Sequence, residues 1–136
     1  MCQFKGESKM KLSWAIRMGS SLRPQCKGNY FDTVNGEVGS CTFGAVLEAI
    51  GAEHSPYKSH LLRETFPLLA VNNLPSPVLP GVTKYLNISC AIVDLNDNQG
   101  WTRERIADWV ETIEKQYPEL AEASTIVEKV PEKALV

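Results

Sequence analysis

The run WTRERIADWVETIEKQY, from Trp101 to Tyr117, constrains the fold more than any other part of the sequence. After Thr102, the large apolar side chains of this run are Ile106, Trp109, Val110, Ile113 and Tyr117. Their spacing of three or four residues predicts a helix with one buried apolar face. Thr102 is the expected N-cap, and Trp101 and Ile106 occupy the positions of a hydrophobic staple around it. We therefore expect Trp101 and Trp109 to pack in the core.

Three further segments have the spacing of amphipathic helices. Residues 13–22 and 56–66 each carry a stripe of apolar side chains, and a proline follows each run. The segment SCTFGAVLEAIG, residues 40–51, is predicted to be a buried helix with Ser40 or Thr42 as its N-cap. Together with the C-terminal helix, these segments predict a chain that is mainly α.

Three stretches have other signatures. Residues 30–40 contain the dipeptide Asn35-Gly36, which favours the two-residue type I′ turn of a β-hairpin. The segment LAVNNLPSPVLPG, residues 69–81, has three prolines in six residues and is expected to be an extended connection. Residues 84–95 alternate as a strand would, but they also fit a helix, and we favour the helix.

The length of 136 residues is that of one ordinary domain, and a hydrophobic content of 43% is sufficient for a core. We predict a mainly α fold, a small single-domain helical bundle with a short β-hairpin near residues 30–40. The domain is expected to span residues 11–118. Residues 1–10 are expected to form a disordered extension, and residues 119–136 a flexible or loosely docked tail.

Charge and composition disfavour several functional classes. The chain has 14 Lys and Arg against 16 Asp and Glu, and a net charge of -2 disfavours binding to nucleic acid through phosphates. No apolar run approaches the roughly twenty residues that span a bilayer, so we expect a cytoplasmic protein without membrane contact. Cys2, Cys26, Cys41 and Cys90 form no Cys-x-x-Cys pair. We therefore predict reduced thiols, no metal site and no cofactor.

The stretch before and within the C-terminal helix has two functional interpretations. Asp94, Asn96 and Asn98 match three positions of a calcium-binding EF-hand loop, but Arg105 stands where that loop needs a glutamate. TRERIADWV resembles the first helix of a helix-turn-helix, but the helical pattern continues to Pro118, where a turn and a recognition helix should follow. We favour a structural role for this stretch and keep nucleic-acid binding as an alternative function.

A thiol-dependent enzyme is a second alternative. Cys41 lies at or next to a predicted helix N-terminus, where free amides stabilise a thiolate, and His54 or His60 could act as its base. However, His54 comes after that helix has ended, and no Asn or Asp can be assigned to orient either histidine. Cys41 is therefore a candidate reactive thiol, and we assign no catalytic residue.

A surface for a protein partner is the third interpretation. Tryptophan and arginine are enriched at binding hot spots. The candidate residues for such a surface are Trp14, Trp101, Trp109, Arg103 and Arg105. An exposed apolar patch could equally serve a homodimer.

Three phrases of the sequence carry a resemblance to known proteins: KLSWAIRMGSSLRPQ, SCTFGAVLEAIG and LNDNQGWTRERIADWVETIE. In this order, within residues 11–114, they resemble a group of small uncharacterised proteins encoded in bacterial genomes and prophages, to which no activity is assigned. Many members have a Cys-Pro-x-Cys element where residues 74–77 of this chain read Leu-Pro-Ser-Pro, so a metal-based role is not expected here. Small phage proteins often act by binding a host or defence protein. The resemblance thus implies an accessory protein that acts through protein–protein interaction.

Overall fold

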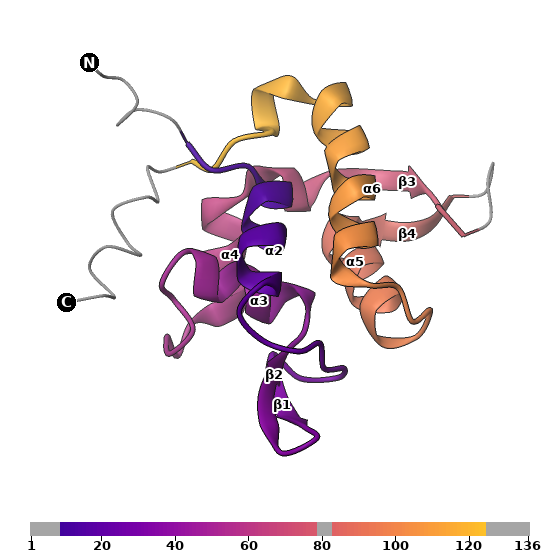
Figure 1. Ribbon diagram of the computed structural model, residues 1–136. Coiled ribbons are helices and arrows are strands. Elements are labelled where there is room, and N and C mark those ends of the chain that lie inside the picture. The colour runs from indigo at the N-terminus through magenta and orange to yellow at the C-terminus, as the bar shows by residue number, and fades with distance from the viewer. Residues whose placement is uncertain (1–8, 79–82, 125–136) are drawn as a thin grey trace.

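The structure of the protein is a computed structural model that describes residues 9–78 and 83–124 (Figure 1). Within these residues the chain is mainly α-helical, as predicted. No helix in the described ranges has the length and apolar character needed to cross a membrane. The elements follow in the order α2 (Leu12–Ser20), β1 (Phe31–Val34), β2 (Glu37–Ser40), α3 (Thr42–Ala49), α4 (Lys58–Thr65), the 3-10 helix η1 (Pro67–Ala70), β3 (Asn72–Pro75), β4 (Thr83–Asn87), α5 (Ile88–Asp97), α6 (Arg103–Gln116) and the 3-10 helix η2 (Pro118–Leu120).

Helix α2 packs against α3 on one side and against α6 on the other (Figure 1). Gly19 allows the close approach to α3, because a Cβ at this position would lie 1.8 Å from the carbonyl oxygen of Ala45. Towards α6, the backbone N–H and the hydroxyl of Ser13 donate to the carboxylate of Glu114 at 2.9 and 2.7 Å. The core around this contact includes Leu12, Ile16, Leu47, Ile92, Leu95, Ile106 and Val110, all fully buried.

The predicted helix after Thr102 is confirmed as α6. The hydroxyl of Thr102 accepts a hydrogen bond from the N–H of Arg105 at 3.2 Å, which is the expected N-cap. Trp101 and Trp109 were predicted to lie in the core, but both are half-buried and pack against its edge. The fully buried Ile106 and Val110 define the centre of the stripe, and Trp109 lies about 100° away from Val110 around the helix.

The predicted hairpin near residues 30–40 is confirmed as β1 and β2. Val34 pairs with Glu37, so Asn35 and Gly36 form a two-residue turn. Their φ angles are 52° and 82°, and both central residues of a type I′ turn require such positive values.

The prediction of a single helix over residues 84–95 is wrong at its start. This segment divides at Asn87, where β4 ends and α5 begins. The Asn87 side chain accepts a hydrogen bond from the N–H of Cys90 at 2.9 Å, so it caps α5 and stops the strand. Strand β4 pairs with β3, which lies in the predicted extended connection. The sequence prediction missed this second hairpin.

The N-cap of α3 is Cys41, whereas Ser40 or Thr42 was predicted. The Cys41 sulfur accepts a hydrogen bond from the N–H of Gly44 at 3.4 Å. Thr42 is already the first residue of α3, and its hydroxyl donates to the side chain of Asn96. Ser40 is the last residue of β2 and pairs with β1. Helices α2 and α4 lie within two residues of their predicted bounds.

The two ends of the described chain lie together. Ala123 donates its N–H to the carbonyl of Met10 at 2.8 Å, and Ser124 donates its N–H to the carbonyl of Thr65 at 2.7 Å. Met10 and Ala123 are both buried. The predicted N-terminal extension lies outside the described residues except for its last two, and the predicted tail is described only as far as Ser124.

Candidate functional site

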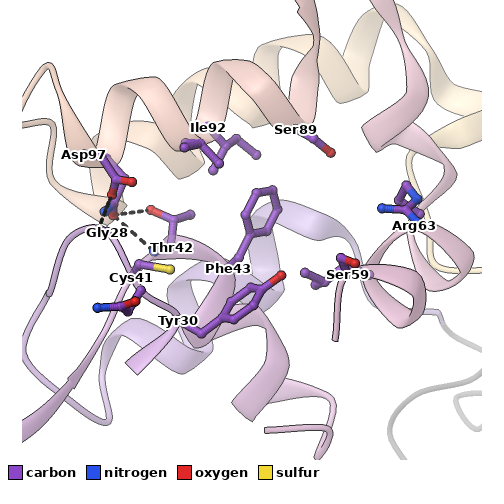
Figure 2. Close-up of a pocket in the computed structure, with 14 residues that line it drawn as sticks. Gly28, Tyr30, Cys41, Thr42, Phe43, Ser59, Arg63, Ser89, Ile92 and Asp97 are labelled. Carbon is purple, nitrogen blue, oxygen red and sulfur yellow. Dashed lines mark hydrogen bonds between the residues drawn. The ribbon is translucent and has the colours of Figure 1, made fainter. Parts of the chain in front are cut away.

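A pocket of about 390 Å³ lies where α3, α4 and α5 meet the loop before β1 (Figure 2). Its apolar wall is formed by Phe43 of α3, Leu62 of α4, and Ile92 and Val93 of α5. Phe43, Leu62 and Ile92 are buried, while Val93 is 47% exposed. A hollow of this size with an apolar wall is in the range of small-molecule sites, which is roughly 300 to 1,000 Å³.

Polar groups stand at the two ends of this pocket. Figure 2 shows Asp97 at one end and Arg63 with Ser59 at the other, with the ring of Phe43 between them. The Asp97 carboxylate already accepts hydrogen bonds from the N–H of Gly28 at 3.0 Å and from the Asn96 amide at 2.8 Å. Among the residues that the structure describes, Arg63 makes no ion pair or hydrogen bond. The pocket therefore has an acidic end, at which Oδ1 of Asp97 is already bonded, and a basic end, at which the exposed Arg63 makes no ion pair within the described residues.

Asn96 fixes the position of this pocket. Its side-chain oxygen accepts hydrogen bonds from the N–H of Thr42 at 3.1 Å, from the Thr42 hydroxyl at 2.8 Å and from the amide of Gln25 at 2.8 Å. Its amide donates to the carbonyl of Cys26 at 3.0 Å. Asn96 is 2% exposed, so these bonds tie α5 to the start of α3 and to the loop before β1 without competition from water.

The positions of Asp94 and Asn96 contradict the interpretation of this segment as a calcium-binding loop. Asp94 and Asn96 lie within α5, and Asn96 is buried and fully engaged with protein groups. The Asp94 carboxylate accepts hydrogen bonds from the side chains of Asn98 and Gln99 at 2.8 and 3.2 Å. These bonds stabilise the C-terminal turn of α5, and they occupy the Asp94 oxygens that a calcium ion would need. Over the described ranges, no group of three or more His, Cys, Asp or Glu side chains is arranged to hold a metal ion.

Cys41 lies in the pocket lining, as a candidate thiol should, but its environment favours the neutral form. Burial raises the pKa of Cys41 above its ordinary value, although hydrogen bonds from the backbone of Gly44 and Phe43 oppose this effect. Neither histidine is among the lining residues, and His60 instead contacts Glu64 at 3.2 Å on the outer face of α4. A nucleophilic cysteine needs a thiolate or a nearby base. Both observations weigh against the hypothesis of a Cys41-dependent enzyme.

Arg103, a candidate for the interaction surface, is 5% exposed and belongs to the interior of the fold. Its guanidinium donates to the carbonyl of Ser40 at 3.1 Å, to the Ser40 hydroxyl at 2.8 Å, and to the carbonyls of Ser20 and Arg23 at 3.2 and 2.6 Å. These bonds hold the end of α2, the loop after it and the end of β2 to the start of α6. Arg103 is therefore a structural residue, which corrects its place among the surface candidates.

The other surface candidates lie in different environments. The Arg105 guanidinium stacks on the ring of Trp101 at 3.8 Å from the ring centre, so the two side chains shield one another. Trp109 is half-buried against the core. Trp14 is 49% exposed, with the ammonium of Lys11 5.4 Å from its ring centre. Of the three tryptophans, only Trp14 presents a largely free ring.

Trp14 belongs to an exposed apolar stripe, here called the α2 stripe, together with Met18 and Leu22. The three side chains are 49%, 48% and 60% exposed and are spaced four residues apart, so they lie along one outer face of α2 and its C-terminal extension. Positions 14 and 18 lie between the buried positions of the predicted helix, so the sequence contained part of this signal. Leu22 was expected on the apolar stripe of residues 13–22, but α2 ends at Ser20 and Leu22 is exposed. We predicted Trp14 alone.

Three carboxylates lie on the neighbouring outer face of α6: Glu104, Asp108 and Glu111. Arg17 of α2 bonds to Asp108 at 2.8 Å and to Glu111 at 2.7 Å, which places this acidic row beside the α2 stripe. Lys11 and Lys115 line a hollow together with Glu111, so the negative excess of this flank lies at its other end, around the exposed Glu104 and Asp108. This excess disfavours contact with a phosphate backbone on this side of the molecule.

Comparison of the chain with models of protein families, with curated proteins and with solved structures found no match.

Proposed function

We propose that the protein is a small cytoplasmic accessory protein that acts by binding another protein through the α2 stripe. The observation that carries this proposal is the exposure of Trp14, Met18 and Leu22 at four-residue spacing. Burying such side chains against a partner removes apolar surface from water, which favours binding. Tryptophan is one of the residues enriched at binding hot spots. The resemblance to small proteins of bacterial genomes and prophages supports an accessory role by analogy.

The chemistry of the flank restricts the partner. Glu104 and Asp108 are exposed beside the later half of the α2 stripe, and the antiparallel contact between α2 and α6 keeps the acidic row alongside it. The partner is expected to present an amphipathic helix whose apolar side chains cover the stripe and whose basic side chains face the acidic row. A nucleic-acid partner is the alternative, and the same acidic row argues against it.

The test is a pull-down with the tagged protein from a nuclease-treated bacterial lysate. The double variant Trp14→Ala/Met18→Ala removes most of the stripe, and Tyr57→Ala is the matched control, because Tyr57 is 69% exposed on a different element. A partner retained by wild type and by the control, and lost by the double variant, supports the proposal. Truncation of a tryptophan hot spot costs about 2–4 kcal/mol, or roughly 30-fold or more in affinity.

Two results would contradict the proposed function. Capture that survives in the double variant would move the binding surface away from the α2 stripe, and recovery of nucleic acid alone from untreated lysate would favour the alternative. Light scattering of the purified protein tests whether a second copy of the chain covers the α2 stripe. If wild type is a dimer and the double variant is a monomer, the stripe serves a homodimer and no separate partner is needed. Circular dichroism of both variants checks that the fold is intact.

A further inference from the structure

The pocket between α3, α4 and α5 has no role in the proposed function, because no residue of α2 is among its lining residues. Its apolar wall and its unpaired polar groups need a separate explanation. Polar groups in a ligand site fix orientation, while the apolar wall supplies most of the buried area.

The end of the pocket near Arg63 collects hydrogen-bond donors. Arg63 and Ser59 come from α4, and Figure 2 shows the hydroxyl of Tyr30 directed towards Ser59. In the described part of the chain, neither the Tyr30 hydroxyl nor the Arg63 guanidinium has a hydrogen-bond partner. Burial raises the pKa of Tyr30, so its hydroxyl keeps the proton and acts as a donor at neutral pH. Donors of this kind, with a fixed positive charge, suit a carboxylate.

The opposite end of the pocket excludes a second negative group. The Asp97 carboxylate lies there, across the ring of Phe43 from Arg63 (Figure 2). A ligand carboxylate near Asp97 would meet like charge, whereas one near Arg63 would meet opposite charge. The ring of Phe43 and the side chain of Ile92 lie between the two ends (Figure 2). A flat apolar body fits this region better than a polar one.

We propose that this pocket binds a small planar aromatic acid, whose rings lie against Phe43 and Ile92 and whose carboxylate bonds to Arg63 and Tyr30. The volume of about 390 Å³ accommodates a molecule of two fused rings. The orientation is set by charge, because Arg63 attracts the carboxylate and Asp97 repels it. The proposed ligand makes no covalent bond with Cys41, whose thiol is held in the neutral form.

The test compares two probes of the same ring system, 2-naphthoate and the neutral 2-naphthylmethanol, in titrations followed by amide nuclear magnetic resonance spectra of the full chain. The acid is expected to shift amides around the pocket, including Gly28, Ser59 and Ser89, and to bind about tenfold more tightly than the alcohol. Arg63→Gln should abolish this difference, whereas Arg105→Gln, which removes an arginine outside the pocket, should preserve it.

A third variant separates the apolar contribution from the charged one. Val93→Ser trims the exposed part of the apolar wall, so it should weaken both probes by a similar factor and leave the preference for the acid unchanged. Equal binding of the two probes to wild type would overturn the assignment of an acid. Shifts centred on Trp14 and Met18, or no saturable shift up to about millimolar probe, a weak-ligand limit, would overturn the site itself.

Discussion

Gly19→Ala tests the close contact between α2 and α3. The added Cβ would lie 1.8 Å from the carbonyl oxygen of Ala45, and 2.4 and 2.6 Å from its carbonyl carbon and Cα. A Cβ contact below 3.0 Å is essentially never adopted, so the two backbones must separate locally by about 1.2 Å, the difference between 3.0 and 1.8 Å. The obstacle is backbone, which cannot rotate away as a side-chain end would.

The expected loss follows from two opposing effects. Overpacking a well-packed contact costs about 1–3 kcal/mol and sometimes more, and a separation of about 1.2 Å removes roughly half or more of each dispersion contact along the seam. The helix propensity of alanine returns about 1 kcal/mol. Because a 1.8 Å contact is an extreme case, we expect a net loss of about 2–3 kcal/mol, or roughly 10 °C in Tm for a domain of this size.

Urea unfolding followed by circular dichroism measures this loss. Gly100→Ala is the matched control, because it adds the same methyl group with no neighbour within 4 Å and is strained only by a φ of 71°. The control should lose about 1 kcal/mol. A Gly19→Ala protein as stable as wild type, or more stable, would mean that helix propensity outweighs the contact, and the packing argument would fail.

Three further predictions concern Arg103, Glu114 and the cysteines Cys41 and Cys90. Arg103→Met should lower the free energy of unfolding by about 3 kcal/mol, because several carbonyls lose their donor, and a loss below about 1 kcal/mol in urea unfolding would contradict its structural role. Burial raises the pKa of Glu114, so folding takes up a proton and wild-type stability falls as pH rises above the ordinary glutamate value. In Glu114→Gln the amide oxygen can accept from the Ser13 N–H and the amide nitrogen can donate to the Ser13 hydroxyl, but the side chain no longer titrates. The variant should therefore lose this part of the fall in stability when unfolding is measured from about pH 4 to pH 8. Iodoacetamide at neutral pH should alkylate the exposed Cys90 faster than Cys41, and peptide mass spectrometry that found the reverse order would revive the reactive-thiol hypothesis.

Local signals in the sequence were sufficient for part of the fold. The cap at Thr102 and the turn at Asn35-Gly36 were predicted correctly, because each depends on backbone geometry that neighbouring residues impose. The division of residues 84–95 at Asn87 was missed. The strand before Asn87 exists only because β3 lies beside it, and β3 begins fifteen positions earlier, at Asn72.

The site depended on contacts that no local pattern reveals. Arg103 and Asn96 are polar residues at helical positions, and such residues are usually assigned to the solvent side. Both are buried because acceptors or donors more than fifty positions away satisfy them, as with Arg103 and Ser40, which are 63 positions apart. Arg63 is likewise an ordinary surface residue in the sequence, and its place in the pocket follows only from how α3 and η1 position α4 and α5 around it.

The bonds that join α2 to α6 determine when the fold can be completed during synthesis. Ser13 and Glu114 are 101 positions apart, Arg17 and Asp108 are 91 apart, and Ser20 and Arg103 are 83 apart. A ribosome that adds roughly 5–20 residues per second makes α6 some five to twenty seconds after α2. Until then one face of α2 has only solvent or another molecule to contact. Native closure of the domain therefore follows the appearance of its last helix, and a nascent chain that stops before Arg103 leaves that face uncovered.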